Sequence, residues 1–267
     1  MYKHISSIQN PLVKEIVQLQ EKSRVRKKKW LFIIEGLREI SLALIGNYQI
    51  QTIWICEEII SIENVIHKLE PPEQIEIITI SKEVYHKISH RKTTEGIIAT
   101  AKTKEFDLSN LKLPKNPLIL IAEAPEKPGN IGALLRTADA ANLDAVIIAN
   151  PKTDLYNPNI IRSSVGCVFT TNIATGNTTD IIDFLKQKSI HSYAAALKEE
   201  SVNYTDIDFK DASAIIVGTE STGLSNDWLN NATKKIIIPM HGEIDSLNVS
   251  VSAAILIFEA KRQRNSN

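Results

Sequence analysis

The chain has 267 residues, 43% hydrophobic and 23% charged, and its 31 basic and 31 acidic residues give a formal net charge of zero. This composition excludes a disordered chain, and the sequence has neither an apolar run of membrane-spanning length nor the apolar core of an N-terminal secretory signal. Cys56 and Cys167 lack both a metal-binding spacing and a disulfide framework, so we expect no metal. These features predict a soluble, cytoplasmic protein with room for two domains.

Basic residues are concentrated in the first half of the chain. Residues 1–116 contain 18 Lys and Arg against 14 Asp and Glu, whereas residues 117–267 contain 13 against 17. The excess is densest from residue 22 to residue 29, where the candidate phosphate-contacting side chains are Arg24, Arg26, Lys27, Lys28 and Lys29. A basic run of this kind is most often a solvated surface, and by itself it indicates nucleic-acid binding only weakly.

The first hundred residues alternate between helical and extended patterns. A helix capped by Ser7 or Asn10 is expected to begin at Pro11, because proline suits the first turn and apolar residues recur at helical spacing. The alternation predicts a small α/β domain over residues 1–101, followed by a linker at 102–117. Further strands are expected at residues 30–34, 50–56, 75–80 and 96–101, with helices at 35–45, 59–69 and 81–88.

The remaining residues, 118–267, predict an open parallel sheet with helices between its strands. Such a sheet carries its ligand at the carboxyl ends of its strands. The dinucleotide fingerprint G-x-G-x-x-G is absent after the first strand, which disfavours an NAD-binding domain. Strands are expected at residues 118–122, 145–149, 167–171, 191–196, 214–217 and 236–238, with helices at 131–141, 157–164, 179–188 and 247–261.

Two loops that follow predicted strands contain candidate site residues. In the loop at 128–138, Asn130 is expected to be the N-cap of a helix. Arg136 lies six residues further on, and it either extends to the surface or points inward, where its guanidinium fork could clamp a phosphate or a ribose. In the loop at 215–225, Glu220 lies between Gly218 and Gly223. This second loop is either a turn with a solvated carboxylate or a site where a ligand approaches the main chain.

A third segment, residues 236–260, reads as a strand, a polar loop and a helix. Pro239 ends the strand because proline has no N–H for the next ladder bond. Ser246 and Asn248 are good N-cap residues, so the simplest interpretation is a capped helix. The start of a helix also suits a polar ligand, since free N–H groups converge there.

Taken together, the three segments resemble the motifs of the SpoU/TrmH family of RNA ribose 2′-O-methyltransferases, within the SPOUT superfamily. The matching stretches are NIGALLRTADA (130–140), IVGTESTGLS (216–225) and IPMHGEIDSLNVSVSAA (238–254). Residues 154–158 and 162–166 resemble the family's segment between its first two motifs. Residues 7–11, 32–36 and 96–99 resemble, less specifically, the substrate-binding domain that often precedes the catalytic one and is itself similar to small ribosomal RNA-binding proteins.

The resemblance implies a C-terminal α/β fold with a deep trefoil knot, S-adenosylmethionine as cofactor and a homodimer packed through the knotted region. By position, the cofactor would contact Gly218, Ile238, Met240 and Leu247. Arg136 is implicated in activating the ribose hydroxyl. Because a guanidinium with a pKa above about 12 is a poor base, we expect it to clamp the ribose and favour the developing oxyanion. The remaining implied catalytic residues are Asn130, Glu220, Ser246 and Asn248.

Two alternatives to ribosomal RNA methylation remain open at this point. The substrate could be transfer RNA, or the protein could be a non-catalytic RNA-binding protein that kept the knot and lost the chemistry. Asn142, Ser221-Thr222 and residues 122–127 depart from the family's pattern. None of these departures removes a candidate catalytic residue, so they concern the fit of the substrate. The sequence does not name the modified nucleotide.

Overall fold

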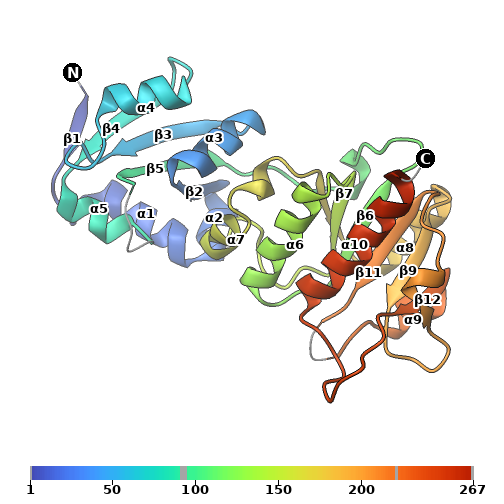
Figure 1. The fold of residues 1–267 in the computed structure, drawn as a ribbon. Coiled ribbons are helices and arrows are strands. Elements are labelled where there is room, and N and C mark those ends of the chain that lie inside the picture. Colours follow the sequence, from blue (N-terminus) through green and yellow to red (C-terminus); the bar gives the residue numbers. More distant parts are fainter. Residues whose placement is uncertain (1, 91–94, 220–221, 266–267) are drawn as a thin grey trace. The chain divides into compact units, whose positions relative to one another are not determined.

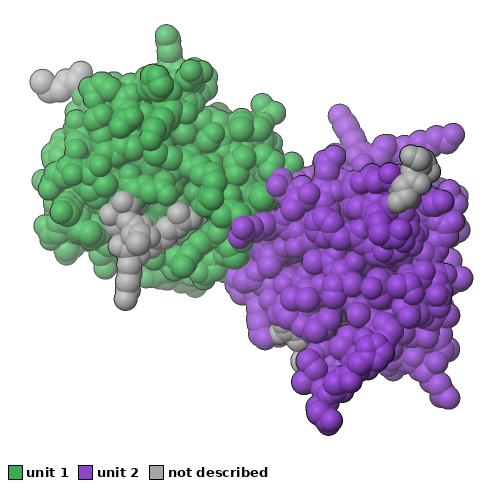
Figure 2. Space-filling view, viewed as in Figure 1, with its two compact units in different colours: residues 1–105, 154–170 green, residues 106–153, 171–267 purple. Residues whose placement is uncertain are grey.

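The protein is described by a computed structural model covering residues 2–90, 95–219 and 222–265. The chain forms two compact units (Figure 2), of which unit 1 comprises Met1–Glu105 with Asp154–Thr170 and unit 2 comprises Phe106–Thr153 with Thr171–Asn267. The junction at residues 105 and 106 falls inside the expected linker. Residues 154–170, expected in the C-terminal domain, pack with unit 1.

Unit 1 is an α/β fold around a five-stranded sheet of order β1-β4-β3-β5-β2 (Figure 1). β1, β4 and β3 are parallel, whereas β5 is antiparallel to both of its neighbours, β3 and β2. The expected alternation of strands and helices is confirmed. The strands are β1 (Lys3–Ile5), β2 (Leu31–Glu35), β3 (Ile50–Ile55), β4 (Glu76–Ile80) and β5 (Ile97–Lys102), and the helices are α1 (Pro11–Glu21), α2 (Ser23–Lys29), α3 (Leu37–Ile45), α4 (Ile62–Leu69) and α5 (Lys82–Ile88).

The N-terminal arm is two helices rather than one. Asn10 caps α1 by accepting a hydrogen bond from the backbone N–H of Leu12 at 2.9 Å. Lys22 then has extended backbone angles, which separate α1 from α2. The apolar stripe of α1 packs into the core that also contains Trp54 and Tyr85. The arm is therefore a packed part of unit 1.

Residues 154–170 join unit 1 through aromatic packing. Tyr156 and Phe169 lie against Phe32, with ring centroids 4.2 and 5.7 Å away, and against Tyr48. The segment contains α7 (Pro158–Ser163) and the 3₁₀ turn η2 (Cys167–Phe169). The strand expected at 167–171 is wrong, because Gly166 adopts a φ of 87° and the chain turns sharply after it. A short buried apolar run looks the same in sequence whether it forms a turn or a strand.

Unit 2 is built on a seven-stranded sheet of order β10-β12-β9-β11-β6-β7-β8, and every neighbouring pair in it is parallel. The predicted parallel α/β fold is confirmed. The strands are β6 (Leu118–Glu123), β7 (Ala145–Ala149), β8 (Ile173–Gly176), β9 (His191–Ala195), β10 (Val202–Asn203), β11 (Ser213–Val217) and β12 (Lys234–Ile237). The helices are α6 (Pro128–Ala140), α8 (Thr178–Gln187), α9 (Asn226–Asn231) and α10 (Val249–Asn265), with 3₁₀ turns η1 (Leu108–Asn110) and η3 (Tyr204–Asp206).

Helices cover both faces of this sheet. Residues of α8 and α9 pack with Ile119 and Ile121, which point to one face of β6. α10 packs against α6 and β11, and α6 and α10 run side by side (Figure 1). The central strands are buried along their whole length, as their continuous apolar sequences predict. The sheet itself therefore leaves its polar contacts to the loops at the strand ends and to the outer faces of the helices.

Candidate active site

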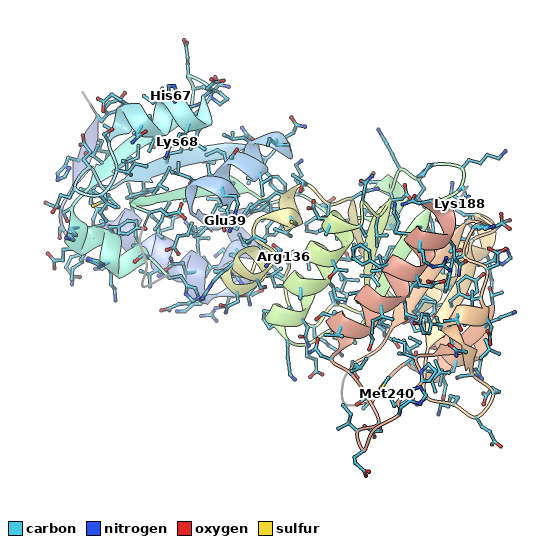
Figure 3. All side chains as sticks on the ribbon, in the orientation of Figure 1. Glu39, His67, Lys68, Arg136, Lys188 and Met240 are labelled. Carbon is cyan, nitrogen blue, oxygen red and sulfur yellow. The ribbon has the colours of Figure 1, made fainter. Side chains whose placement is uncertain are left out.

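A cavity of about 600 Å³ lies at the carboxyl ends of β9, β11 and β12. All four expected cofactor residues line it, together with Ser246 and Asn248, so the second and third motifs meet at one place. Met240, labelled in Figure 3, lies in the loop between β12 and α10. The lining residues are Ala195, Ala196, Leu197, Lys198, Val217, Gly218, Thr219, Thr222, Gly223, Leu224, Leu229, Ile236, Ile237, Ile238, Met240, Asp245, Ser246, Leu247, Asn248, Val249 and Ser252.

The loop after β11 closes on itself. The backbone N–H groups of Thr219 and Gly223 each donate to the carbonyl of the other at 3.1 Å, and the hydroxyls of Thr219 and Thr222 are 2.7 Å apart. A Cβ on Gly218 would lie 2.3 Å from the carbonyl carbon of Gly223, closer than any real contact. Glycine is therefore required here by close approach of the main chain. Glu220 and Ser221 lie outside the described residues.

Replacing Gly218 by alanine is expected to open this loop and weaken binding of S-adenosylmethionine by more than about tenfold, because the contact that blocks Cβ is backbone and cannot swing away. Isothermal titration calorimetry measures the change. Gly129→Ala is the matched control, since a Cβ at Gly129 meets nothing within 4 Å. Equal affinity of both variants for the cofactor would show that the tight loop is irrelevant to binding.

The segment between β12 and α10 joins the cavity to α6. Asn248 caps α10, because its side-chain oxygen accepts from the N–H of Ser250 at 3.0 Å and from its hydroxyl at 2.6 Å. Its amide nitrogen donates to Oδ1 of Asn130 at 3.3 Å, which links the first and third motifs. Ser246 instead donates to Asp245 at 3.1 Å. Of the two expected capping residues, Asn248 is therefore the one bonded to the first turn.

The position of Asn130 corrects one expectation. α6 begins at Pro128 with Lys127 as its N-cap, so Asn130 lies inside the first turn and is not the cap. Proline at the first helical position explains the shift, because its missing N–H costs nothing there. The side-chain oxygen of Asn130 accepts the hydrogen bond from Asn248.

Arg136 is exposed on α6, so within one chain it takes the first of its two predicted orientations and extends to the surface. The buried residues of α6, among them Leu134, Leu135 and Ala138, occupy the other side of the helix. Arg136, labelled in Figure 3, does not line the 600 Å³ cavity, and within the described residues its guanidinium has no hydrogen bond or ion pair. A long cation held on a rigid helix without a partner is available to an external anion.

The basic run does not present all its side chains to solvent. Arg24, Lys27, Lys28 and Lys29 are exposed, whereas Arg26 is only 3% exposed, and this corrects the expectation that Arg26 faces RNA. Its guanidinium donates to the carbonyls of Leu19 and Gln20 at 2.6 and 3.0 Å and pairs with both oxygens of Asp154. Arg26 is thus an anchor within unit 1.

Sequence reasoning missed two contributions to the site. Residues 195–198 after β9 line the cavity, and the rule that ligands bind at carboxyl strand ends could have identified them. Glu123, at the end of β6, is buried and accepts bonds from the N–H and the hydroxyl of Ser225 at 2.8 and 2.7 Å and from Thr178 at 3.0 Å. Glu123 therefore holds the end of the second motif.

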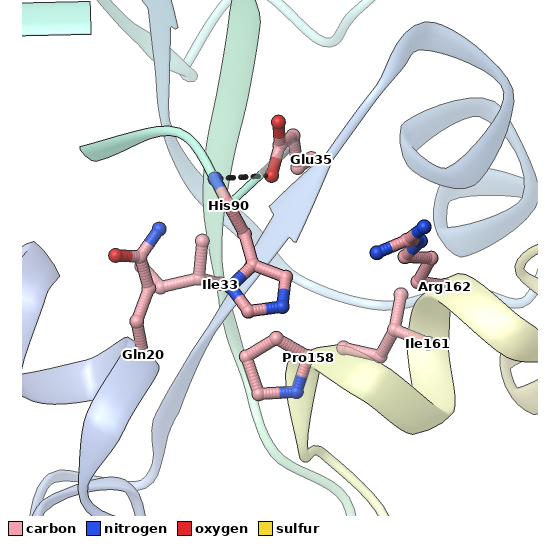
Figure 4. Close-up of a pocket in the computed structure, with 7 residues that line it drawn as sticks. All are labelled: Gln20, Ile33, Glu35, His90, Pro158, Ile161 and Arg162. Carbon is pink, nitrogen blue, oxygen red and sulfur yellow. Dashed lines mark hydrogen bonds between the residues drawn. The ribbon is translucent and has the colours of Figure 1, made fainter. Parts of the chain in front are cut away.

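A second cavity, of about 20 Å³, lies within unit 1 and is lined by Gln20, Ile33, Glu35, His90, Pro158, Ile161 and Arg162 (Figure 4). The backbone N–H of His90 donates to Glu35 at 2.8 Å, and the His90 ring lies 3.1 Å from Oδ1 of Asn159. This volume holds about one water molecule, so it is too small for a nucleotide. Among the described residues there is no cluster of three or more potential metal ligands, and no helix suited to crossing a membrane.

Comparisons with known proteins agree with this geometry. Residues 117–258 match the SpoU rRNA Methylase family, and residues 10–99 match the MRM3-like substrate binding domain. The chain is 29% identical to the 23S rRNA (guanosine(2553)-2′-O)-methyltransferase of Bacillus subtilis, over 97% of this chain and 99% of that one. It is 34% identical to the tRNA (guanosine(18)-2′-O)-methyltransferase of Thermus thermophilus, over 55% of this chain and 75% of that one.

A crystal structure with bound cofactor is also similar. The AdoMet-bound rRNA methyltransferase of Sinorhizobium meliloti superposes with a TM-score of 0.89 and 28% identity, covering 99% of both chains. The family match spans more than half of this chain, and it includes every element that lines the 600 Å³ cavity. The chain therefore belongs to the SpoU rRNA methylase family and is an RNA ribose 2′-O-methyltransferase that uses S-adenosylmethionine.

Proposed function

We propose that this enzyme methylates the 2′-hydroxyl of one ribose in ribosomal RNA, in the cytoplasm. The observation that carries the proposal is the 600 Å³ cavity, where the second and third motifs meet beside the Asn130–Asn248 link. The choice of ribosomal RNA is supported by the Bacillus subtilis relative, which aligns over nearly the whole chain. The tRNA enzyme of Thermus thermophilus aligns over 55% of the chain only.

The cavity fits the cofactor by its size and its lining. Its volume lies within the range of small-molecule sites, about 300–1,000 Å³. Ile238, Met240 and Leu247 offer apolar contacts for an adenine ring, and Gly218 lets the ligand approach the main chain. When bound, the cofactor supplies a methyl group already activated on a sulfonium. The protein must then align the ribose oxygen and assist loss of its proton.

Arg136 is proposed to clamp the ribose and its adjoining phosphate. A guanidinium is a poor base, so a substrate phosphate or water accepts the proton. Its fixed fork of N–H donors favours negative charge developing on the 2′-oxygen. Ser246 and Asn248 face the sugar, and Asn130 orients Asn248 through the hydrogen bond between their side chains.

The enzyme is proposed to act as a homodimer through a trefoil-knotted unit 2. α10 carries an apolar stripe at helical spacing, in which Val251 and Phe258 are 46% and 51% exposed and Ile255 is half-buried. A second copy covering this stripe removes it from water. Because Arg136 does not line the cavity of its own chain, the partner's cavity is the proposed place where it acts.

Phe258→Glu is expected to convert the dimer into a monomer, because it places a charge within the apolar stripe. Sedimentation velocity measures the change in mass, and methyl transfer is expected to fall with it. Ile66→Glu, at a residue of α4 that is 40% exposed, is the matched control. A monomeric wild type, or a Phe258→Glu variant that stays dimeric, contradicts this interface.

The proposed activity is tested by incubating the protein with methyl-labelled S-adenosylmethionine and either ribosomal or transfer RNA. Label is expected in ribosomal RNA at one position that resists alkaline cleavage, because a methylated 2′-oxygen cannot attack the adjoining phosphate. Label in transfer RNA alone would identify transfer RNA, and not ribosomal RNA, as the substrate. If calorimetry detects no cofactor binding, the protein is instead a non-catalytic RNA-binding protein.

A further inference from the structure

Trp30 is an exposed tryptophan directly after the basic helix α2. Its side chain is 55% exposed, whereas the other two tryptophans, Trp54 and Trp228, are 3% and 1% exposed. Within the described residues the indole makes no contact with another aromatic ring or a cation. The sequence placed Trp30 at the start of a buried strand, but β2 begins one residue later, at Leu31. Trp30 therefore offers a flat aromatic face to solvent, directly after the cations of α2 in sequence.

The backbone holds Trp30 in a conformation that its side chain disfavours. It is the C-cap of α2, with φ 56° and ψ 33°, the left-handed region that glycine and asparagine occupy most easily. Its N–H donates to the carbonyl of Arg26, and its own carbonyl accepts from the N–H of Thr103 at 3.0 Å. These bonds fix where the indole leaves the main chain. Conformations of this kind concentrate at functional sites.

Three cations share one face of α2, the helix that ends at Trp30. At about 100° per residue, Arg24, Lys27 and Lys28 fall on one side of the helix, and Arg26 falls on the opposite side. The three are exposed, and none has a hydrogen bond or ion pair in the part of the chain that the structure describes. On the opposite, buried side of α2, Arg26 anchors the helix through its bonds to residues 19, 20 and 154.

We propose that Trp30 is a stacking platform for an unpaired base of the substrate RNA, with Arg24, Lys27 and Lys28 binding the flanking phosphates. An aromatic face beside cations is the arrangement that binds single strands, because every base has a π-face and every nucleotide a phosphate. A duplex hides its base faces, so the proposed ligand is a loop or a bulge. The inference rests on the proposed function, because it concerns recognition of the same RNA.

Intrinsic fluorescence provides the direct test. A single-stranded RNA of about eight nucleotides, within the usual site size, is expected to quench the exposed tryptophan, while duplex RNA of the same length quenches little. Trp30→Leu is expected to raise the Kd for the single strand about tenfold and to abolish quenching, and Trp30→Phe to retain most of the affinity. Tyr2→Leu, at an aromatic residue of unit 1 that is 48% exposed, is the matched control and is expected to bind like wild type.

Trp30→Asn separates binding from a structural role. Asparagine tolerates the left-handed conformation, so this variant is expected to raise Tm by about 2 to 4 °C while weakening RNA binding as Trp30→Leu does. If Trp30 served only to end the helix, Trp30→Asn would bind RNA like wild type. A Trp30→Asn variant that is more stable but binds RNA more weakly would show that the tryptophan ring serves RNA binding and not the ending of the helix.

The outcomes also separate this inference from the proposed function. Wild type that methylates RNA, with an unchanged KM for RNA in Trp30→Leu and no quenching, overturns the stacking role alone. Wild type that transfers no methyl group to any RNA, but whose tryptophan is quenched by single strands, overturns the methylation proposal alone. The stacking role requires that Trp30→Leu raise KM for RNA while kcat and the Kd of S-adenosylmethionine stay at wild-type values.

Discussion

Arg136→Ala is expected to lower kcat/KM for RNA methylation by about 10²- to 10³-fold, the loss that follows removal of one donor aimed at a developing oxyanion. The fold should tolerate the change, because Arg136 is exposed on α6 and none of the described contacts depends on it. We expect Tm to change by less than about 1 °C, since such surface substitutions stay within about 0.5 kcal/mol. Single-turnover methyl transfer to ribosomal RNA is the measurement.

Two further variants make the Arg136 experiment specific. Arg136→Lys keeps the charge but loses the planar fork, so it is expected to retain only a minor part of the activity. Lys188→Ala removes an exposed cation that follows α8 near the amino end of β9, opposite the cavity (Figure 3), and should leave the rate unchanged. Wild-type turnover in Arg136→Ala would show that another group activates the ribose.

Asp154→Ala is expected to destabilise the protein by about 3–5 kcal/mol, because it leaves the buried Arg26 guanidinium without its carboxylate. The two side chains are 4% and 9% exposed, so water cannot replace the lost partner. Asp154 also accepts from the N–H of Tyr156 at 3.0 Å, which holds the start of the inserted segment. Urea unfolding followed by circular dichroism measures the loss.

Replacing both Arg26 and Asp154 shows whether the stability lost in Asp154→Ala comes from the unpaired buried charge of Arg26 or from another effect on residues 154–170. Arg26→Met combined with Asp154→Leu is expected to recover most of the lost stability, because two apolar side chains need no partner. Glu15→Ala is the matched control, since it breaks the exposed 2.8 Å pair with Lys29 and should cost under about 1 kcal/mol. If Asp154→Ala were as mild as Glu15→Ala, the Arg26–Asp154 pair would not anchor α2.

The arrangement of the site explains why its motifs are spread along the chain. Parallel strands send their carboxyl ends to one edge of the sheet, so the loops after β9, β11 and β12 meet there although they lie far apart in sequence. Glu123 then ties the end of β6 to Ser225 and Thr178. Each loop is thus held at both ends by buried structure, which keeps the cavity in shape.

The sequence by itself determined the elements whose signal is local. Apolar runs such as 118–122 predicted buried parallel strands, and Asn10 before Pro11 predicted the start of α1. The resemblance of the second and third motifs to a known family identified residues that line the cavity, because both motifs adjoin strands. These features depend on neighbours in the chain, so a reader of the sequence alone can infer them.

Only the tertiary structure decided which way several of these residues face. Arg26 looks like its basic neighbours in sequence, and its burial depends on Asp154, which is 128 residues away. Cys167–Phe169 has the composition of a strand, yet packing against Phe32 and Tyr48 makes it a turn of unit 1. The orientation of Trp30 also depends on a residue distant in sequence, because the N–H of Thr103 holds the Trp30 carbonyl by a hydrogen bond. Contacts between distant segments select among conformations that are locally equivalent, and no local pattern records them.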